Sequence, residues 1–305
     1  MSHHKTLNKK GRVVPHWNLS KLELKAAIAA APMRKAKPKI PAHKIAQDRL
    51  FVQPRSKLHD HLVDLSKFLG QLTLTKVRKN QKDLTAGEWT SLKAAISVIA
   101  ESTAASPRYD EFVDVHARAM DTMAGMAWGA HRGINFLSWH REFLAKFEAR
   151  LQLVNPTVTL PYWDWVNDRA IPTQLADRNA FPSWPVSRGT LNAGGLPTQP
   201  MMNGVMGSGV TPPNFNAFRG ALESPPHDSV HIAVGGTMAT SRSPNDPIFW
   251  LHHAMVDKVW ADWQRANPGA AFDPPNPTEV LRPTPIFTRK VGEVLNTTDL
   301  GYIYG

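Results

Sequence analysis

The stretch DPIFWLHHAMVDKVW, residues 246–260, places two adjacent histidines in the middle of a strongly apolar segment. An apolar segment of this length with few polar breaks is typical of a buried helix. Burying an imidazole among apolar side chains is costly unless its nitrogens find a partner. We therefore expect His252 and His253 to meet a ligand or another polar group inside a helical core.

Five further histidines beyond the N-terminal region also lie on or beside predicted helices. The full set is His116, His131, His140, His227, His231, His252 and His253. His227 and His231 are four residues apart, so a helix places them on one face, where they can share a metal ion. A single pair of this kind is weak evidence, and a structural role is the commoner one for any one histidine. Seven imidazoles in four apolar helices together favour metal binding.

The spacing of His131 and His140 requires a break in the helix between them. Nine residues of uninterrupted helix would place the two rings on opposite faces. Gly133, followed by a helix start near Ser138, allows both rings to point inward. His116 belongs to an earlier helix, and the aromatic-rich helix of His140 can pack beside it.

The sequence contains no cysteine, which limits the kinds of metal site that the chain can build. Disulfides, zinc-thiolate sites and thiol nucleophiles are excluded. Ligation by imidazole alone suits copper or zinc, and three nitrogens per ion leave a coordination position open for chemistry. Six such ligands would make two sites.

The net charge of +11 is concentrated at the N-terminus. Residues 1–60 hold 14 Lys or Arg and three acidic residues, so the remainder of the chain is balanced. We expect residues 1–70 to form a basic N-terminal extension and residues 71–305 a catalytic domain. The extension could support oligomerisation, and nucleic acid is an unlikely partner of a domain without excess charge.

No apolar run approaches the roughly 20 residues of a membrane helix, and the N-terminus lacks the apolar segment of a secretory signal. The expected location is therefore cytoplasmic by default, with export alongside a partner as the other option.

The pattern from residue 76 onward is that of a packed helical domain. Thr85 and Glu88 form a predicted capping box, and later helices begin near Pro107 and Ser138. Two more helices are predicted in PPHDSVHIAV and PIFWLHHAMVDKVWADWQRAN. The stretch 171–220, rich in Pro, Gly, Asn and Ser, is expected to be a long irregular loop that flanks the site.

Four segments together resemble the tyrosinase family of type 3 copper proteins, close to its bacterial members. They are HRGINFLSWHREFLAKFE from residue 131, LPYWDW from residue 160, PHDSVHIAVGG from residue 226 and SPNDPIFWLHHAMVDKVWADW from residue 243. The resemblance covers about residues 76–305. It implies a mostly α fold whose four-helix-bundle core holds a dicopper centre, with long irregular loops around it.

The resemblance also implies an activity and a ligand set. The family hydroxylates monophenols ortho to the hydroxyl and oxidises o-diphenols to o-quinones, with two copper ions as cofactor and O2 as co-substrate. A phenolic small molecule is the expected partner, and some relatives use a helper protein that delivers copper or covers the site. The residues that match the first copper's ligands are His116, His131 and His140, and those that match the second copper's are His227, His231 and His253.

Two acidic residues match positions that handle the phenol's proton in the family. A phenol has a pKa near 10, so a base must remove its proton before it binds a metal well. Glu223 matches a glutamate that orients a water molecule. Asp228 stands where relatives with strong monophenol activity often have asparagine, so it could help to accept the proton or hold the water unproductively. Arg242 and Ser243 are expected near the pocket mouth, where the arginine would favour carboxylate substrates.

The resemblance assigns His253, rather than its neighbour, to the second copper. Asp257 lies one turn further on and is expected to accept the other ring N–H of His253. His252 points about 100° away on an ideal helix, which favours a structural or supporting role, packed near the site. Near the end of the chain, Tyr302 and Tyr304 resemble paired tyrosines that dock near an arginine, here Arg78.

Other activities remain open at this point. A catechol oxidase or o-aminophenol oxidase with little monophenol activity would use the same residues. A hemocyanin-like O2 carrier would use the same centre but exclude phenols. A zinc hydrolase is suggested by HDSVH, residues 227–231, which is similar to a His-Glu-x-x-His helix, yet it leaves the other histidines unexplained.

Overall fold

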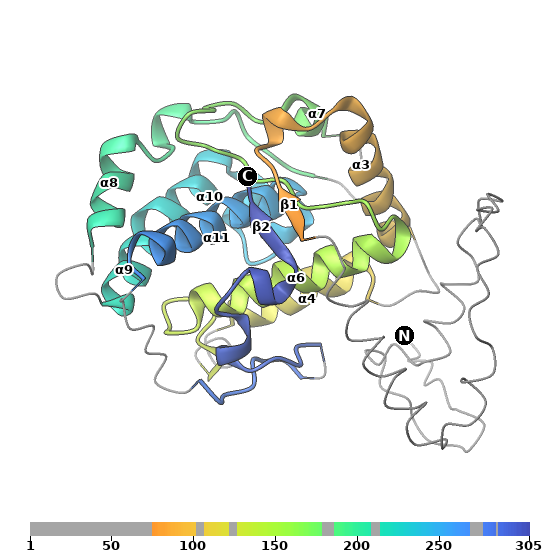
Figure 1. Cartoon of the computed structure of the whole chain (residues 1–305). Coiled ribbons are helices and arrows are strands. Elements are labelled where there is room, and N and C mark those ends of the chain that lie inside the picture. Colours follow the sequence, from red (N-terminus) through yellow and green to blue (C-terminus); the bar gives the residue numbers. More distant parts are fainter. Residues whose placement is uncertain are drawn as a thin grey trace, which may run out of the picture. The chain divides into compact units, whose positions relative to one another are not determined.

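The computed structural model describes residues 75–101, 107–121, 127–178, 186–208, 214–268, 277–284 and 286–305 (Figure 1). The predicted basic extension, residues 1–70, lies outside these residues. Among the described residues, no helix combines the length and the apolar character needed to cross a bilayer.

The described part is mostly helical, as predicted, with one small sheet. Its α-helices are α3 (Ala86–Glu101), α4 (Tyr109–Ala119), α6 (Phe136–Val154), α7 (Thr173–Ala176), α8 (Gln199–Gly207), α9 (Phe215–Leu222), α10 (Asp228–Val234) and α11 (Ile248–Ala266). The strands are β1 (Lys76–Arg78) and β2 (Tyr302–Tyr304). The helices α4, α6, α10 and α11 carry most of the seven histidines and form the four-helix core.

Helix α3 forms as the capping pattern predicts. Glu88 accepts from the backbone N–H of Thr85, and Thr85 Oγ1 accepts from the N–H of Glu88, so two of the first N–H groups are satisfied. The apolar face of α3, which includes Leu92 and Ile96, is buried. This face packs against α4 and α6.

The longest of the described helices, α6 and α11, pack against each other (Figure 1). Large aromatic residues form this contact. Phe147 of α6 stacks on Trp250 of α11 with ring centroids 3.6 Å apart and planes at 6°. Phe143 packs on the same indole at 5.0 Å. Each such pair contributes about 0.5–1.5 kcal/mol beyond the area it buries. This contact fixes the spacing of the two helices that carry His140 and His253.

Two predicted boundaries were wrong. Helix α6 begins at Phe136, after the N-cap residue Asn135, and not near Ser138, which lies inside its first turn. The stretch 171–220 is not an irregular loop throughout, because it contains α7, α8 and most of α9. Helix α8 begins after Thr198, whose side chain caps its N-terminus. Each of these helices has only four to nine residues, and the Pro, Gly, Asn and Ser residues around them hid them in the sequence.

The small sheet joins the two ends of the described part. Strands β1 and β2 pair in parallel, with Arg78 opposite Tyr304. The sequence did not predict these strands, because each has only three residues. The pairing nevertheless brings the predicted arginine and tyrosines together, as described below.

Candidate metal centre

Three histidines from one side of the core form the first group. His116 comes from α4, His131 from the turn before α6, and His140 from α6. The ring of His131 lies 5.0 Å from that of His116 and 4.9 Å from that of His140, centroid to centroid. One nitrogen of each ring lies within 4.8 Å of the others, so the three can share one metal ion.

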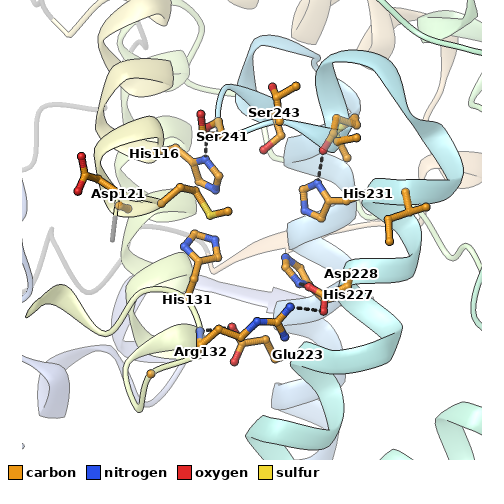
Figure 2. A pocket seen from close by; sticks show the side chains of 17 residues that line it. His116, Asp121, His131, Arg132, Glu223, His227, Asp228, His231, Ser241 and Ser243 are labelled. Carbon is orange, nitrogen blue, oxygen red and sulfur yellow. Dashed lines mark hydrogen bonds and ion pairs between the residues drawn. The ribbon is translucent and has the colours of Figure 1, made fainter. Parts of the chain in front are cut away.

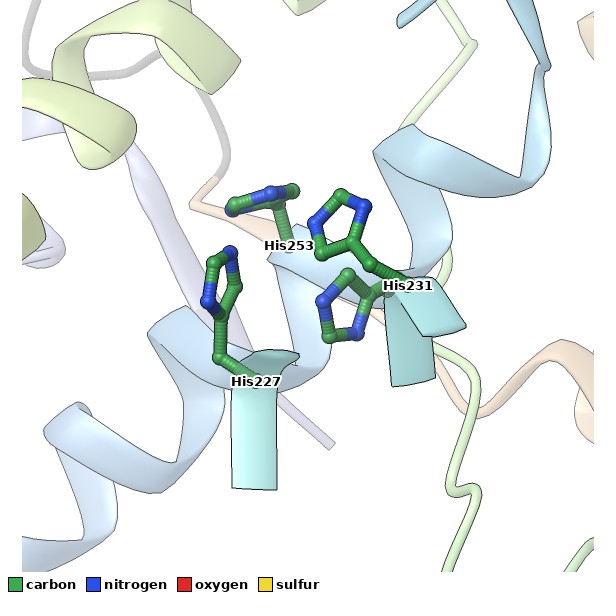
Figure 3. Close-up of side chains that lie close together, drawn as sticks. His227, His231 and His253 are labelled. Carbon is green, nitrogen blue, oxygen red and sulfur yellow. The ribbon is translucent and has the colours of Figure 1, made fainter. Parts of the chain in front are cut away.

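The second group draws on α10 and α11, and its members approach one another in Figure 3. The rings of His227 and His231 are 4.7 Å apart, as their four-residue spacing predicts. His253 lies 5.0 Å from His227 and 5.5 Å from His231. His252 belongs to the same group, and one nitrogen of each of the four lies within 4.8 Å of the others.

His252 lies within the second group, although its ring was expected to point away from it. Its ring lies 4.9 Å from His231 and stacks on His227 at 5.3 Å, so both histidines of the pair face α10. The rings of His227 and His231 thus contact two residues that are about 100° apart on α11. His252 also packs on Trp165, at 6.4 Å, away from the first group. The expectation that it lies near the centre was correct, but the expectation that it points away was wrong.

Hydrogen bonds to one ring nitrogen fix the tautomer of several histidines. His116 donates its Nδ1–H to the carbonyl of Ser241 at 2.8 Å, and His231 donates its Nδ1–H to the carbonyl of Met238 at 2.7 Å. In the same way, Nδ1–H of His140 donates to the carbonyl of Phe136, one turn earlier in the same helix, at 2.8 Å. The other nitrogen is then a free acceptor. This is how metal-binding histidines are usually oriented.

The nitrogens left over are buried and have no hydrogen-bond partner among the described residues. They are Nε2 of His116, His140 and His227, Nδ1 of His131, and both nitrogens of His252 and His253. Leaving so many polar atoms unsatisfied would cost the fold several kcal/mol if nothing bound them. A metal ion in each group would bind one nitrogen from each of its ligand rings, and an all-imidazole donor set suits copper. The residues present therefore fit a dicopper centre.

Burial also keeps these imidazoles in the form that binds metal. It lowers the pKa of His231 to about 3, with the neighbouring His227 adding to the effect. Burial, followed by repulsion from neighbouring histidines, likewise lowers the pKa of His116, His140 and His253 well below the usual value. The rings are thus neutral at physiological pH and can donate an electron pair to a metal.

The predicted bond between His253 and Asp257 is absent. Both nitrogens of His253 lack a hydrogen-bond partner, and the carboxylate of Asp257 is turned to Arg141, with Nε to Oδ1 at 2.5 Å. The four-residue spacing was read correctly, but two buried guanidinium groups attract the carboxylate more strongly than a neutral imidazole does. Asp257 therefore serves the structure around the centre.

The predicted docking of the tyrosines near Arg78 is confirmed. The hydroxyls of Tyr302 and Tyr304 each donate to Oδ2 of Asp257, at 2.6 Å. The guanidinium of Arg78 stacks on the ring of Tyr302, at 3.6 Å, and donates to Tyr304 at 3.1 Å. Arg78 also makes a buried ion pair with Glu148 of α6, at 2.8 Å. This network attaches both ends of the described part to α6 and α11.

A cavity of about 740 Å³ opens onto both histidine groups (Figure 2). Its wall includes His116, His131, His227 and His231, and the acidic residues Asp121, Glu223 and Asp228. Apolar side chains such as Ile232 and Met238 line part of the remainder. The volume suits a small aromatic molecule.

Glu223 lies at the cavity wall, with both carboxylate oxygens held. Oε1 accepts from the backbone N–H of Arg132 at 2.5 Å, and Oε2 accepts from the Arg219 guanidinium at 2.8 Å. Burial outweighs these contacts and raises the pKa of Glu223 above its usual value. A higher pKa makes the carboxylate a stronger base. The segment Glu223–His227 is a π-helical turn with two prolines, which presents both residues to the same cavity.

Asp228 also reaches the cavity, but its carboxylate is tied on both sides. Oδ1 accepts from Nδ1 of His227 at 3.1 Å, and Oδ2 pairs with Nη2 of Arg132 at 2.6 Å. Although burial opposes ionisation, these two contacts hold the pKa of Asp228 well below its usual range. Asp228 is thus ionised whenever the protein is folded at neutral pH.

Arg132 is a cavity residue that the sequence did not predict. Arg132 lines the cavity beside the first group of histidines. Its position immediately after His131 was the available signal. Arg242 pairs with Asp114 at 2.9 Å and is not part of the cavity wall, although the adjacent Ser241 is, so its selection of carboxylate substrates stays a prediction. Ser243 does line the cavity, as expected.

Comparison with known proteins identifies the same family from the whole sequence. The family model described as the common central domain of tyrosinase matches residues 106–194 and 196–266, more than half of the chain. The chain is 40% identical to a tyrosinase of Streptomyces glaucescens, covering 65% of this chain and 86% of that protein. It is 29% identical to grixazone synthase of Streptomyces griseus, covering 64% and 86% respectively.

Solved structures share the fold at lower identity. A functional unit of octopus hemocyanin has a TM-score of 0.62 at 19% identity and covers 75% of this chain and 68% of that one. A latent apple tyrosinase has a TM-score of 0.59 at 20% identity, covering 76% and 62%. The family model matches more than half of this chain, and the match to the Streptomyces glaucescens tyrosinase covers 86% of that protein. The chain therefore belongs to the tyrosinase family.

Proposed function

We propose that this chain is a copper-dependent monophenol and o-diphenol oxidase. It hydroxylates phenols ortho to the hydroxyl group and oxidises o-diphenols to o-quinones, with O2 as the oxidant. The observation that carries the proposal is the pair of buried histidine groups, with unpartnered nitrogens, at the wall of one cavity of about 740 Å³. The relatives named tyrosinase support it.

We assign the two metal ions to two sets of three histidines. The first set is His116, His131 and His140, and the second is His227, His231 and His253. Copper bound there supplies O2 binding and the redox chemistry. His253 is preferred to His252 because its ring faces both sets, stacking on His140 at 4.2 Å. His252 then packs behind the second set, against Trp165.

The chain's own residues provide orientation, exclusion of water and a proton acceptor. The apolar wall with Ile232 and Met238 receives the aromatic ring and leaves its hydroxyl facing the histidines. Glu223 takes the phenol's proton, directly or through a water molecule, because burial raises the pKa of its carboxyl group. Asp228 is held in an ion pair, so we assign it to the orientation of His227 and not to the proton transfer.

The oxygen balance of the reaction gives a direct test. A monophenol converted to its o-quinone consumes one O2 and releases one water, whereas an o-diphenol consumes half as much O2 per quinone. The copper-loaded protein should oxidise both, and O2 uptake per quinone should differ twofold between them. Turnover of the diphenol alone would indicate a catechol oxidase, and turnover of an o-aminophenol alone an o-aminophenol oxidase. Reversible O2 binding without turnover would indicate an O2 carrier.

Partners other than the phenol stay predictions. A helper protein that delivers copper is consistent with a centre whose ligand nitrogens are almost completely buried, with His140 only 2% exposed. Oligomerisation through the basic extension, residues 1–70, is a further proposal. Copurification and light scattering of the full chain test these two proposals.

A further inference from the structure

Arg132 occupies an unusual position between the two histidine groups. It follows His131 directly and has a φ of 54°, in the left-handed region that residues other than glycine seldom adopt. The turn is tight, because a Cβ on Gly133 would lie 2.5 Å from the Cα of Gly129. The surrounding contacts thus hold Arg132 in a conformation that an isolated chain would avoid.

Two contacts connect Arg132 to the acidic residues on the opposite wall (Figure 2). Its backbone N–H donates to Oε1 of Glu223 at 2.5 Å, and its Nη2 pairs with Oδ2 of Asp228 at 2.6 Å. The first contact depends only on the backbone, while the second depends on the guanidinium. A side-chain substitution therefore separates the two.

The guanidinium contact continues into the second histidine group. Oδ1 of Asp228 accepts from Nδ1 of His227 at 3.1 Å, which leaves Nε2 of His227 buried and without a partner. Because Nδ1 carries the hydrogen, Nε2 is the nitrogen that can bind a metal. Arg132, Asp228 and His227 thus form a chain of contacts from the first group's turn to a ligand of the second.

The exposure of these side chains decides what kind of role they can have. The side chain of Arg132 is 63% exposed, that of Asp228 26% and that of His227 5%. An ion pair this exposed adds little to the stability of the fold. It does restrict the rotation of the Asp228 side chain, whose alternative orientations would leave Nδ1 of His227 without its acceptor. Orientation, rather than stability, is the effect to expect.

We propose that Arg132 is a positioning residue that holds Asp228 as the hydrogen-bond acceptor of His227 and so aligns this histidine for the second copper. The proposal rests on the proposed function for the identity of the metal. Arg132 itself contacts neither the metal nor the phenol in this role. Its side chain acts only through Asp228, and its backbone acts separately on Glu223.

Copper retention is the measurement that tests this role independently of turnover. The copper-loaded full chain is mixed with a chelator, and the loss of each copper is followed by spectroscopy and elemental analysis. In Arg132→Gln, one of the two coppers should leave about tenfold faster, as expected when the partner of a metal-binding histidine is lost. Arg132→Lys should restore most of the retention because it keeps the cation. The diphenol KM should change less than kcat.

A double substitution distinguishes the proposed relay from separate effects. Asp228→Asn alone should speed the loss of the same copper, and Arg132→Gln with Asp228→Asn should be no worse than the more severe single change. Arg242→Gln is the matched control, because this arginine also holds an exposed ion pair, with Asp114, but lies outside the cavity. It should leave retention unchanged.

Three results would overturn the proposal. The first is unchanged copper retention in Arg132→Gln. The second is a rate of copper loss in the double variant that equals the product of the two single-variant increases. The third is equal loss of both coppers in Arg132→Gln together with a lower unfolding midpoint. The last result would mean that Arg132 is merely structural. A wild-type protein that retains copper but oxidises no phenol would instead sink the proposed function and leave the retention test valid.

Discussion

The ring of His140 stacks on the ring of His253, with centroids 4.2 Å apart and planes at 9°. These residues belong to α6 and α11 and lie 113 positions apart in the chain, 253 − 140. Their contact is shorter than the other ring contacts between the two groups, such as His131 with His227 at 6.4 Å. A metal ion in one group would therefore lie close to a metal ion in the other, as a shared substrate requires.

The adjacent histidines should differ in their effect on metal content. His253→Ala should leave the protein with one copper, because this ring contacts both groups, while His252→Ala should keep two. His252 packs against Trp165 and has no ring contact with the first group's His140 within the described residues. Elemental analysis of both variants after copper loading checks this. The opposite pattern would assign His252 as the ligand.

Removing the proposed base should affect hydroxylation most. Glu223→Gln keeps the size of the side chain but cannot accept a proton, so monophenol turnover should fall by about 10². Copper content should stay at the wild-type level. The measurement is initial O2 uptake with a monophenol and with a diphenol, and Asp114→Asn serves as the control at an exposed acidic residue. Full monophenol turnover in Glu223→Gln would refute its role.

The buried carboxylate of Asp257 should be a large contributor to stability. Asp257→Asn leaves Arg141 buried without its anion and removes one of the two carboxylates that face Arg78, and this should cost about 3–5 kcal/mol of unfolding free energy. Tyr302→Phe removes one hydrogen bond to the same carboxylate and should cost only about 1 kcal/mol. Urea denaturation of the copper-free protein gives both values. Equal small losses would show that the network is not coupled to folding.

The copper-free protein should lose stability as the pH falls. Burial lowers the pKa of His231 to about 3, whereas an unfolded histidine titrates near 6.5. Between these values the unfolded state binds more protons than the folded state, so stability is full above about pH 6.5 and decreases below it. Each such histidine adds up to about 1.4 kcal/mol per pH unit.

Urea denaturation of the copper-free protein at pH 7.5, 6 and 5 measures this slope, and His231→Gln should reduce it by the share of one histidine. A stability that stays constant over this range would show that the histidines are not held neutral by burial.

The sequence predicted the helices that carry the centre because their apolar periods are strong. The helix around His253 and the four-residue spacing of His227 and His231 both follow from local pattern, and the resemblance to the family added which histidine belongs to which group. The contacts of Asp257 and Arg132 could not be predicted, because they depend on residues far away in the chain. Asp257 meets Arg78 across 179 positions and Arg141 across 116. The position of a residue on its own helix does not predict which distant residues it will contact.

Copper stoichiometry of single-group variants tests the central claim most directly. The wild-type protein, loaded with copper and freed of excess by gel filtration, should hold two copper ions per chain. His140→Ala and His231→Ala should each hold one, because each change disrupts only its own group. Wild-type protein that holds one copper or none, or variants that both keep two, would contradict a dicopper centre built from these two groups of histidines.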